Sequence, residues 1–278
     1  MLTYKLTNGV EIPVIGYGTW QVEGEVAVAS VEEAIKAGYR HIDTAQAYGN
    51  EKFVGEGIRR SGIARDELFV TTKLTNANHS YDLTMSSFVQ SLKDLGLDYV
   101  DLFLVHWPCP IQVRDRWQDA NAETWRAIEE LYADGRIRAI GVSNFHQRHI
   151  DALLQTAKVA PMVDQIRLCP GCTQDEVVDY CRKNNILLEA YSPLGRGQVS
   201  EVEKINKIAS KYGKSASQIA IRWSLDMGFL PLPKSVTPSR IRDNLNVFDF
   251  ELTKDEVETL KNLTGCAGLA PDPDTMPF

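Results

Sequence analysis

The strongest constraint on the fold is a regular alternation of short apolar runs with segments of helical periodicity. Eight apolar runs, each about as long as a strand, follow one another along the 278 residues. They are residues 14–18, 39–43, 68–73, 99–106, 138–143, 163–168, 186–192 and 229–234. Several are apolar almost throughout, as in residues 100–105. Such runs are typical of parallel strands that are covered on both faces.

Between the runs, apolar side chains recur at the spacing of an amphipathic helix. Val28, Val31 and Ile35 fall at i, i+3 and i+7 and would line one helix face. Three further faces are formed by Met85, Phe88, Val89, Leu92 and Leu95, by Trp125, Ile128, Leu131 and Tyr132, and by Val202, Ile205, Ile208, Ala209 and Tyr212. A glycine follows several of these segments, which predicts helix ends at Gly38, Gly62, Gly96 and Gly135.

Eight strand–helix units without a break in composition predict a single domain over residues 1–278, a (β/α)8 TIM barrel. The alternative is a doubly wound open sheet, whose usual fingerprint is Gly-x-Gly-x-x-Gly after the first strand. Here Gly16 and Gly18 are followed by Thr19-Trp20-Gln21, so the third glycine is missing. The barrel is therefore favoured.

Charge and cysteine content narrow the class of protein. The formal net charge of −7 argues against a nucleic-acid or anionic-membrane partner. No run of about 18 apolar residues is present and residues 1–6 lack a signal-peptide apolar segment, so we expect a cytoplasmic protein without a membrane span. The five cysteines, an odd number, indicate reduced thiols. Cys169 and Cys172 form a Cys-x-x-Cys without the second pair that zinc would need, so free thiols are favoured over a redox pair and no metal is expected.

In a barrel of this type, functional side chains lie where the strands end. The polar residues at or near the ends of the apolar runs are Asp43, Lys73, His106, Ser143, Asn144, Gln165, Tyr191, Ser192, Lys234 and Ser235. We expect them to meet at one end of the barrel, close to Tyr48 in the loop after the second run.

Four of the residues at this end form a plausible acid catalyst: Asp43, Tyr48, Lys73 and His106. A phenol has a pKa of about 10, which a neighbouring ammonium lowers. Asp43 would hold Lys73, and the imidazole would polarise a substrate carbonyl oxygen. Taken singly, each has a structural explanation: an ion pair for Asp43 and Lys73, and core packing for the two rings. Their joint position favours proton transfer to a carbonyl oxygen.

The other polar residues suit a cofactor. Ser143, Asn144 and Gln165 could hydrogen-bond a carboxamide, and Tyr191 could stack on a flat ring. Cations and hydroxyls gather at the last strand–helix junction, namely Lys234, Ser235, Thr237 and Arg240. They could bind a phosphate group at a helix N-terminus. The alternative at this junction is an ordinary helix start with solvated charges.

Four longer motifs carry a resemblance to a known family: residues 38–51, residues 92–108, the run Ile140-Gly141-Val142-Ser143-Asn144-Phe145, and Pro233-Lys234-Ser235. Through them the chain resembles the aldo-keto reductases, NADPH-dependent barrel enzymes, over essentially its whole length. The resemblance implies that Asp43, Tyr48, Lys73 and His106 are the catalytic tetrad, with Tyr48 as the general acid.

The resemblance also implies the cofactor contacts. Ser143, Asn144 and Gln165 would hold the nicotinamide carboxamide, and Tyr191 would stack on the ring. The other residues expected to contact NADPH are Thr19, Trp20, Asp43, Ser192, Leu194, Gly195, Lys234, Ser235, Val236, Thr237, Arg240 and Asn244. The substrate pocket would be lined by Trp20, Tyr48, His106 and Trp107.

The sixth run departs from the family pattern Asn-Gln-Ile-Glu-Leu-His-Pro, because it reads Asp164-Gln165-Ile166-Arg167-Leu168-Cys169-Pro170. We hypothesise that Arg167 helps to bind carboxylated substrates. In relatives a longer loop than the segment 195–200 covers the cofactor, so the resemblance implies comparatively free exchange of NADPH here.

The two ends of the chain lie outside the alternation. Residues 2–14 read as a β-hairpin around Asn8-Gly9. Residues 268–278 contain three prolines, cannot form a helix, and by family analogy lie across the barrel mouth.

These features predict reduction of aldehydes and ketones, and the resemblance implies NADPH as the cofactor and a monomer as the assembly. The resemblance favours bacterial-type enzymes that act on dicarbonyls, sugar-derived ketones and simple aldehydes. The rival is a barrel that binds NADPH as a sensor or regulatory subunit without significant turnover. The complete acid–base set weighs against it.

Overall fold

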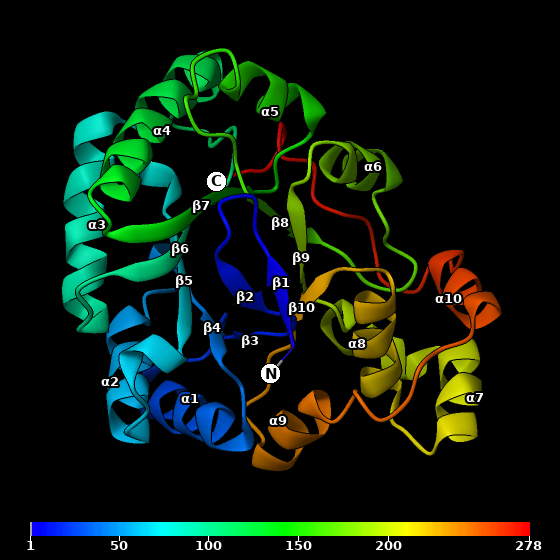
Figure 1. The fold of residues 1–278 in the computed structure, drawn as a ribbon. Coiled ribbons are helices and arrows are strands. Elements are labelled where there is room, and N and C mark those ends of the chain that lie inside the picture. Colours follow the sequence, from blue (N-terminus) through cyan, green and yellow to red (C-terminus); the bar gives the residue numbers. More distant parts are fainter. Residues whose placement is uncertain (1) are drawn as a thin grey trace.

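The computed structural model describes residues 2–278 and begins with the expected hairpin. Strands β1 (Thr3–Lys5) and β2 (Glu11–Pro13) pair antiparallel, with Tyr4 opposite Ile12. The hairpin lies across the middle of a ring of strands (Figure 1), where it covers one end of the barrel.

Eight parallel strands form the ring. They are β3 (Tyr17–Gly18), β4 (His41–Asp43), β5 (Phe69–Leu74), β6 (Val100–Val105), β7 (Ile137–Ser143), β8 (Val163–Arg167), β9 (Leu187–Tyr191) and β10 (Leu230–Leu232). Each strand pairs with the next along the chain. Two backbone hydrogen bonds of 3.1 Å, from Gly16 N to Pro231 O and from Gly18 N to Pro233 O, join the last strand to the first. The predicted (β/α)8 barrel is confirmed, and the open sheet is not found.

Helices surround the barrel (Figure 1). They are α1 (Gly24–Ala37), α2 (Glu51–Ser61), α3 (Tyr81–Leu95), α4 (Trp117–Ala133), α5 (Gln147–Leu153), α6 (Asp175–Lys183), α7 (Glu203–Tyr212), α8 (Ala216–Asp226), α9 (Pro238–Leu245) and α10 (Lys254–Lys261). As predicted, α1 ends at Gly38, whose φ of 114° few other residues adopt. Every residue of β5 and β6 is buried, as expected for strands covered on both faces.

The C-terminal tail after α10 returns to the barrel, as predicted. In Figure 1 it runs in red past α6 towards α5. Arg167 at the end of β8 donates hydrogen bonds to the carbonyl oxygens of Ala267 and Leu269. The backbone nitrogen of Ile111 donates to Phe278 O at 3.3 Å. Because Arg167 and Ile111 follow strand ends at the C-terminal face, the tail lies over that face.

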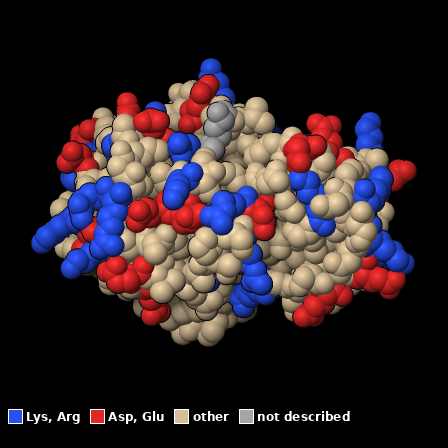
Figure 2. All heavy atoms as spheres, turned by 90° about the horizontal axis from the view of Figure 1, so that it is seen from below, with Lys and Arg blue, Asp and Glu red and all other residues tan. Residues whose placement is uncertain are grey.

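The surface carries mixed charge. On the face drawn in Figure 2, Lys and Arg side chains are interspersed with Asp and Glu, and neither sign covers a large area. Among residues 2–278, no helix has both the length and the apolar character needed to cross a membrane.

Candidate active site

The centre of the site is a buried ammonium held by three oxygens. Lys73 Nζ on β5 lies 2.7 Å from Asp43 Oδ1, 2.8 Å from Thr44 O and 3.3 Å from Tyr48 Oη. Lys73 has no exposed surface and Asp43 is 3% exposed. A buried lysine requires such partners, because burial of an unpaired ammonium is costly. The strand ends therefore bring Asp43, Lys73 and Tyr48 together as predicted.

The loop between β4 and α2 is fixed by hydrogen bonds that place Tyr48. The Asn50 amide nitrogen donates to the carbonyl oxygens of Thr19 and Val22, each at 2.8 Å. Asn50 Oδ1 accepts from Thr44 Oγ1 at 2.9 Å. The short helix η1 (Gln46–Tyr48) then ends at Gly49, whose φ of 67° reverses the chain. Tyr48 thus leaves the loop pointing at Lys73.

His106 reaches the same place from the end of β6. Its ring meets the Tyr48 ring edge to face, with centroids 5.8 Å apart. Burial and the nearby Lys73 ammonium lower the pKa of His106 to about 3. The imidazole is therefore uncharged at neutral pH, and its N–H group can donate to a carbonyl oxygen without transferring a proton.

The electrostatics of Tyr48 differ from the prediction. Burial raises the pKa of Tyr48, and the lowering by Lys73 is too small to reverse this while Asp43 also raises it. Burial lowers the pKa of Lys73, but Asp43 and Tyr48 more than compensate, so the net shift is upward. In the free protein Tyr48 is a neutral acid beside a charged lysine. Lys73 lowers the pKa of the phenol as predicted, but burial of the ring and the Asp43 charge raise it by more.

Gln165 on β8 is held through its amide nitrogen by two carboxyl groups. Gln165 Nε2 donates to Asp43 Oδ2 at 2.9 Å and to Glu189 Oε2 at 2.7 Å. The contact with Asp43 fixes the orientation of the amide, since a flipped amide would set its oxygen against the Asp43 carboxylate. Gln165 Oε1 is left to accept from a ligand, as a carboxamide contact requires.

Ser143, Asn144 and Tyr191 form a second group above β7–β9. Tyr191 Oη donates to Asn144 Oδ1 at 2.8 Å, and Asn144 Nδ2 donates to His106 O at 3.0 Å. Ser143 Oγ donates to Gln165 O at 2.7 Å. The structure brings these residues beside His106 and Gln165, where a flat ring could meet Tyr191.

The junction of β10 and α9 presents free cations. Lys234 and Arg240 are exposed and have no hydrogen-bond or ion-pair partner within residues 2–278, whereas Arg242 on the same helix is paired with Glu33. Thr237 precedes α9 and its backbone nitrogen donates to Ser235 Oγ at 3.1 Å. Unpaired cations at a helix start are suited to a phosphate group. Of the remaining predicted residues here, Val236 is exposed and Asn244 is buried.

Comparison with known proteins decides the family. The model of the aldo/keto reductase family matches residues 14–264. The chain belongs to the aldo/keto reductase family. It is 47% identical over 277 residues to the glyoxal reductase of Bacillus subtilis, covering 99% of this chain and 98% of that one.

Two solved structures agree with the family assignment. An aldo-keto reductase from a Medee basin deep-sea metagenome library is 42% identical, with a TM-score of 0.93 over 99% of this chain and all of that one. The Bombyx mori aldo-keto reductase in complex with NADP is 37% identical, with a TM-score of 0.86 over 94% and 92% of the two chains. The chain is thus an oxidoreductase of the aldo/keto reductase family, and nothing supports the sensor alternative.

Two tryptophans flank the mouth of this reductase, as the pocket prediction requires. Trp20 follows β3 and is 40% exposed, with the Arg196 guanidinium 5.2 Å from its ring centroid. Trp107 follows β6 and meets the Phe278 ring edge to face at 5.3 Å. Thr19 lies beneath Trp20 and donates to Asp43 O at 3.0 Å. The mouth is therefore lined by rings from both sides.

The predicted pyrophosphate residues of the reductase lie in the loop after β9. Gly195 N donates to Ser192 O at 2.9 Å, and Leu194 directly precedes the helical turn η5 (Gly195–Glu201). Ser192 and Gly195 both have left-handed backbones, with φ of 50° and 53°. The tight turn brings this loop back towards Trp20.

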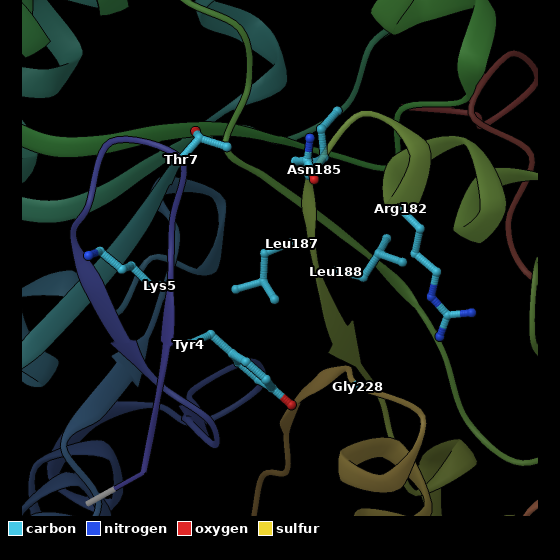
Figure 3. A pocket seen from close by; sticks show the side chains of 9 residues that line it. Tyr4, Lys5, Thr7, Arg182, Asn185, Leu187, Leu188 and Gly228 are labelled. Atoms are coloured by element: carbon cyan, nitrogen blue, oxygen red, sulfur yellow. The ribbon is translucent and has the colours of Figure 1, made fainter.

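A hollow at the hairpin end is unrelated to the reaction centre. Figure 3 shows Tyr4 of β1 and Leu187 and Leu188 of β9 at its wall, together with Arg182 and Gly228. These β9 residues begin the strand that Tyr191 ends, so the hollow lies at the opposite end of the barrel. It contains none of the predicted site residues.

Cys109, His149 and Asp274 meet closely enough to resemble a metal site. The His146 backbone nitrogen donates to His149 Nδ1 at 3.0 Å, so the ring proton sits on Nε2 and points at Asp274 Oδ1, 2.9 Å away. A protonated Nε2 cannot ligate a metal. The group instead fastens the tail, because Asp274 also pairs with Arg148.

The Cys-x-x-Cys motif forms a narrow turn below the tail. Cys169 and Cys172 exchange backbone hydrogen bonds of 3.1 and 2.8 Å, and both are free thiols. The preference for free thiols over a redox pair stays a prediction.

Sequence reasoning missed Glu189 and the tail contacts. Glu189 lies two residues before Tyr191 on the same strand, so the two-residue period of a strand places both side chains inside the barrel. That signal could have identified it. The partners of the tail come from distant loops, and no local pattern marks them.

Proposed function

We propose that this reductase converts small aldehydes and dicarbonyls to alcohols, with Tyr48 as proton donor and His106 as the group that orients the carbonyl oxygen. NADPH, when bound, supplies the hydride that attacks the carbonyl carbon. The observation that carries the proposal is the chain of contacts from Asp43 through Lys73 to Tyr48, with the His106 ring facing Tyr48.

Each residue of the tetrad then has one task. Tyr48 gives its proton to the oxygen as negative charge develops there. Lys73 stabilises the phenolate that remains, because its ammonium lies 3.3 Å from Tyr48 Oη. Asp43 holds Lys73 in that position. His106 donates an N–H hydrogen bond to the oxygen, which its uncharged state at neutral pH permits.

The cofactor preference follows from the cations beyond β10. Lys234 and Arg240 would meet the 2′-phosphate that distinguishes NADPH from NADH, together with Ser235, Thr237 and Asn244. Gln165 Oε1 would accept from the carboxamide of the nicotinamide, with Ser143 and Asn144 beside it and Tyr191 on the ring. Ser192, Leu194 and Gly195 would follow the pyrophosphate. NADPH should therefore be used in clear preference to NADH.

The substrate proposal rests on the mouth and on a relative. The Bacillus subtilis relative is named a glyoxal reductase. Trp20 and Trp107 would enclose a small carbonyl compound of that kind. We accordingly expect glyoxal, methylglyoxal and simple aromatic aldehydes to be substrates of this chain.

The test is a substrate panel with the purified protein. NADPH consumption would be followed with methylglyoxal, aromatic aldehydes and keto acids, with NADH in parallel. Turnover of dicarbonyls and aldehydes with NADPH is expected. Tight binding of NADPH without consumption against any member of the panel would contradict the proposal and support the sensor.

Location and assembly are proposals of the same kind. The five free thiols agree with a reducing compartment such as the cytoplasm. We propose a single-domain monomer over residues 1–278, which sedimentation would test.

A further inference from the structure

A buried acid with no part in the reaction described above lies close to the catalytic residues. Glu189 on β9 has no exposed surface, and the pairing of β8 with β9 sets it opposite Gln165. Its Oε2 accepts from Gln165 Nε2, the nitrogen that also binds Asp43. A continuous set of contacts therefore runs from Glu189 through Gln165, Asp43 and Lys73 to Tyr48.

Among residues 2–278, the groups that act on Glu189 include a single cation. Lys73 is that cation, and its nearest carboxylate is Asp43, at 2.7 Å. His41 Nε2 on β4 lies 3.9 Å from Glu189 Oε1, but burial and Lys73 lower the pKa of His41 to about 3, so it is uncharged. Glu189 Oε1 has no hydrogen-bond partner among residues 2–278. Two carboxyl groups that share one amide and one ammonium cannot both ionise at little cost.

Asp43 therefore takes the negative charge and Glu189 keeps its proton at neutral pH. Burial, together with the Asp43 charge, raises the pKa of Glu189 to about 8. The assignment of the charge to Asp43 follows from its direct contact with Lys73, which Glu189 lacks.

We propose that Glu189 is a positioning residue that holds the Gln165 amide while uncharged and, once ionised, favours the oxidised over the reduced cofactor. The inference rests on the proposed function, because Gln165 is taken to receive the carboxamide. The nicotinamide ring is positively charged in NADP+ and neutral in NADPH. A negative charge on Glu189, which is hydrogen-bonded to Gln165, would stabilise the charged ring of NADP+ and not the neutral ring of NADPH.

The test is the ratio of the NADPH and NADP+ dissociation constants between pH 6.5 and 9.5, measured by fluorescence titration of the whole protein. Both cofactors carry the same 2′-phosphate, so its titration cancels in the ratio. In the wild type, NADP+ should gain on NADPH by on the order of tenfold across this range, with a midpoint near pH 8. In Glu189→Gln the ratio should not change with pH, while NADPH affinity at pH 7 is retained because the amide oxygen can still accept from Gln165.

The control variant is Glu51→Gln. Glu51 is also a buried acid, with 7% of its surface exposed. It accepts a 2.6 Å hydrogen bond from Thr72 Oγ1, and Thr72 precedes Lys73 on β5 and faces away from the barrel interior. Glu51→Gln should leave the pH dependence of the ratio intact. A second variant, Glu189→Leu, removes the acceptor and should weaken NADPH binding several-fold at pH 7.

A measurement on the wild type alone covers the case in which the variants do not fold. Calorimetry at pH 8 in two buffers of different ionisation heat counts the protons released on binding. Binding of NADP+ should release about 0.4 proton more than binding of NADPH. This is the value expected if Glu189 is half ionised at pH 8 in the free protein and its ionised form favours NADP+ over NADPH tenfold. Equal proton release by both cofactors, or an unchanged pH dependence in Glu189→Gln, would overturn the inference. A protein that never consumes NADPH would instead overturn the proposed function.

Discussion

Lys73 is the residue on which the reaction centre most depends, because it is a fully buried ammonium with a single carboxylate in direct contact. Asp43→Asn should lower the free energy of unfolding by about 3–5 kcal/mol, since removing one member of a buried pair leaves the other charge uncompensated. Urea unfolding measures the change. Activity should fall as well, because Lys73 is no longer held against Tyr48.

The double variant Asp43→Asn with Lys73→Met separates stability from chemistry. Without either charge, most of the lost stability should return while turnover remains absent. If the double variant were no more stable than Asp43→Asn alone, the pair would not be the source of the loss.

At the scale of single residues, strand ends were enough to predict that Asp43, Lys73 and His106 lie together, with Tyr48 reaching them from the loop after β4. Their catalytic roles stay predictions. The pKa of Tyr48 was not predictable, because it depends on how deeply the loop buries the phenol. Glu189 was missed because the sequence does not show which residue lies opposite an acid inside an apolar run. That partner follows only from the register with the neighbouring strand.

Among the elements, the tail depends on Arg167. Arg167 is 8% exposed and its guanidinium binds the carbonyl oxygens of Ala267 and Leu269. Arg167→Met should free the tail, make it more sensitive to protease and raise the KM for aromatic aldehydes several-fold, since Phe278 packs on Trp107 at the mouth. Arg59→Met, at an exposed position of α2, is the matched control. An unchanged KM and digestion pattern would argue against tail anchoring.

The hypothesis that Arg167 binds carboxylated substrates stays a prediction. Its guanidinium already has tail carbonyls as partners, so a substrate carboxylate would have to share it. Assays of the wild type and of Arg167→Glu with keto acids and neutral aldehydes would test this, and unchanged discrimination between the two substrate classes in Arg167→Glu would count against it.

The loop after β9 contacts the barrel mouth through Arg196. The Arg196 guanidinium lies over the exposed Trp20 ring, and an exposed pair of this type contributes about 0.5–1 kcal/mol. Arg196→Ala should therefore speed cofactor release by at most about fivefold, as stopped-flow fluorescence would show. If cofactor release were slow in the wild type and a hundredfold faster in Arg196→Ala, the loop would be a true lid. That result would contradict the predicted free exchange.

For the elements, all eight strands were predictable from apolar runs, and the ends of α1, α2 and α3 from Gly38, Gly62 and Gly96. The tail was placed by family analogy alone. Its anchors are Arg114, Arg167 and the neighbouring pair Arg148 and His149, which holds Asp274 of the tail. They come from three separate segments with no shared pattern, so only the folded chain reveals them.

For the whole molecule, buried groups with shifted pKa values set the pH of greatest stability. Glu189 is protonated in the fold up to about pH 8 and ionises above pH 4.5 when unfolded. Raising the pH from 6.5 to 8 should therefore lower the free energy of unfolding by about 2 kcal/mol through Glu189 alone. Asp164, whose pKa burial also raises, acts in the same direction.

Buried histidines act in the opposite direction below pH 6.5. Burial lowers the pKa of His41 and His149 to about 3 and that of His79 to about 4, so the unfolded chain takes up protons first and stability falls with the pH. The thermal midpoint should thus be highest near pH 6, where the histidine and carboxyl effects balance. Glu189→Gln should flatten the alkaline side, and a midpoint that kept rising to pH 8 would contradict these assignments.

The barrel itself was predictable because an alternation repeated eight times leaves few other folds. The reaction class followed from side chains at one end of it. The role of Tyr48 as proton donor is tested most directly by Tyr48→Phe, assayed for NADPH consumption with methylglyoxal and for NADPH binding by fluorescence. Turnover should fall by about 10²–10⁴-fold with the dissociation constant of NADPH little changed. Turnover within a few-fold of the wild type would contradict the assignment.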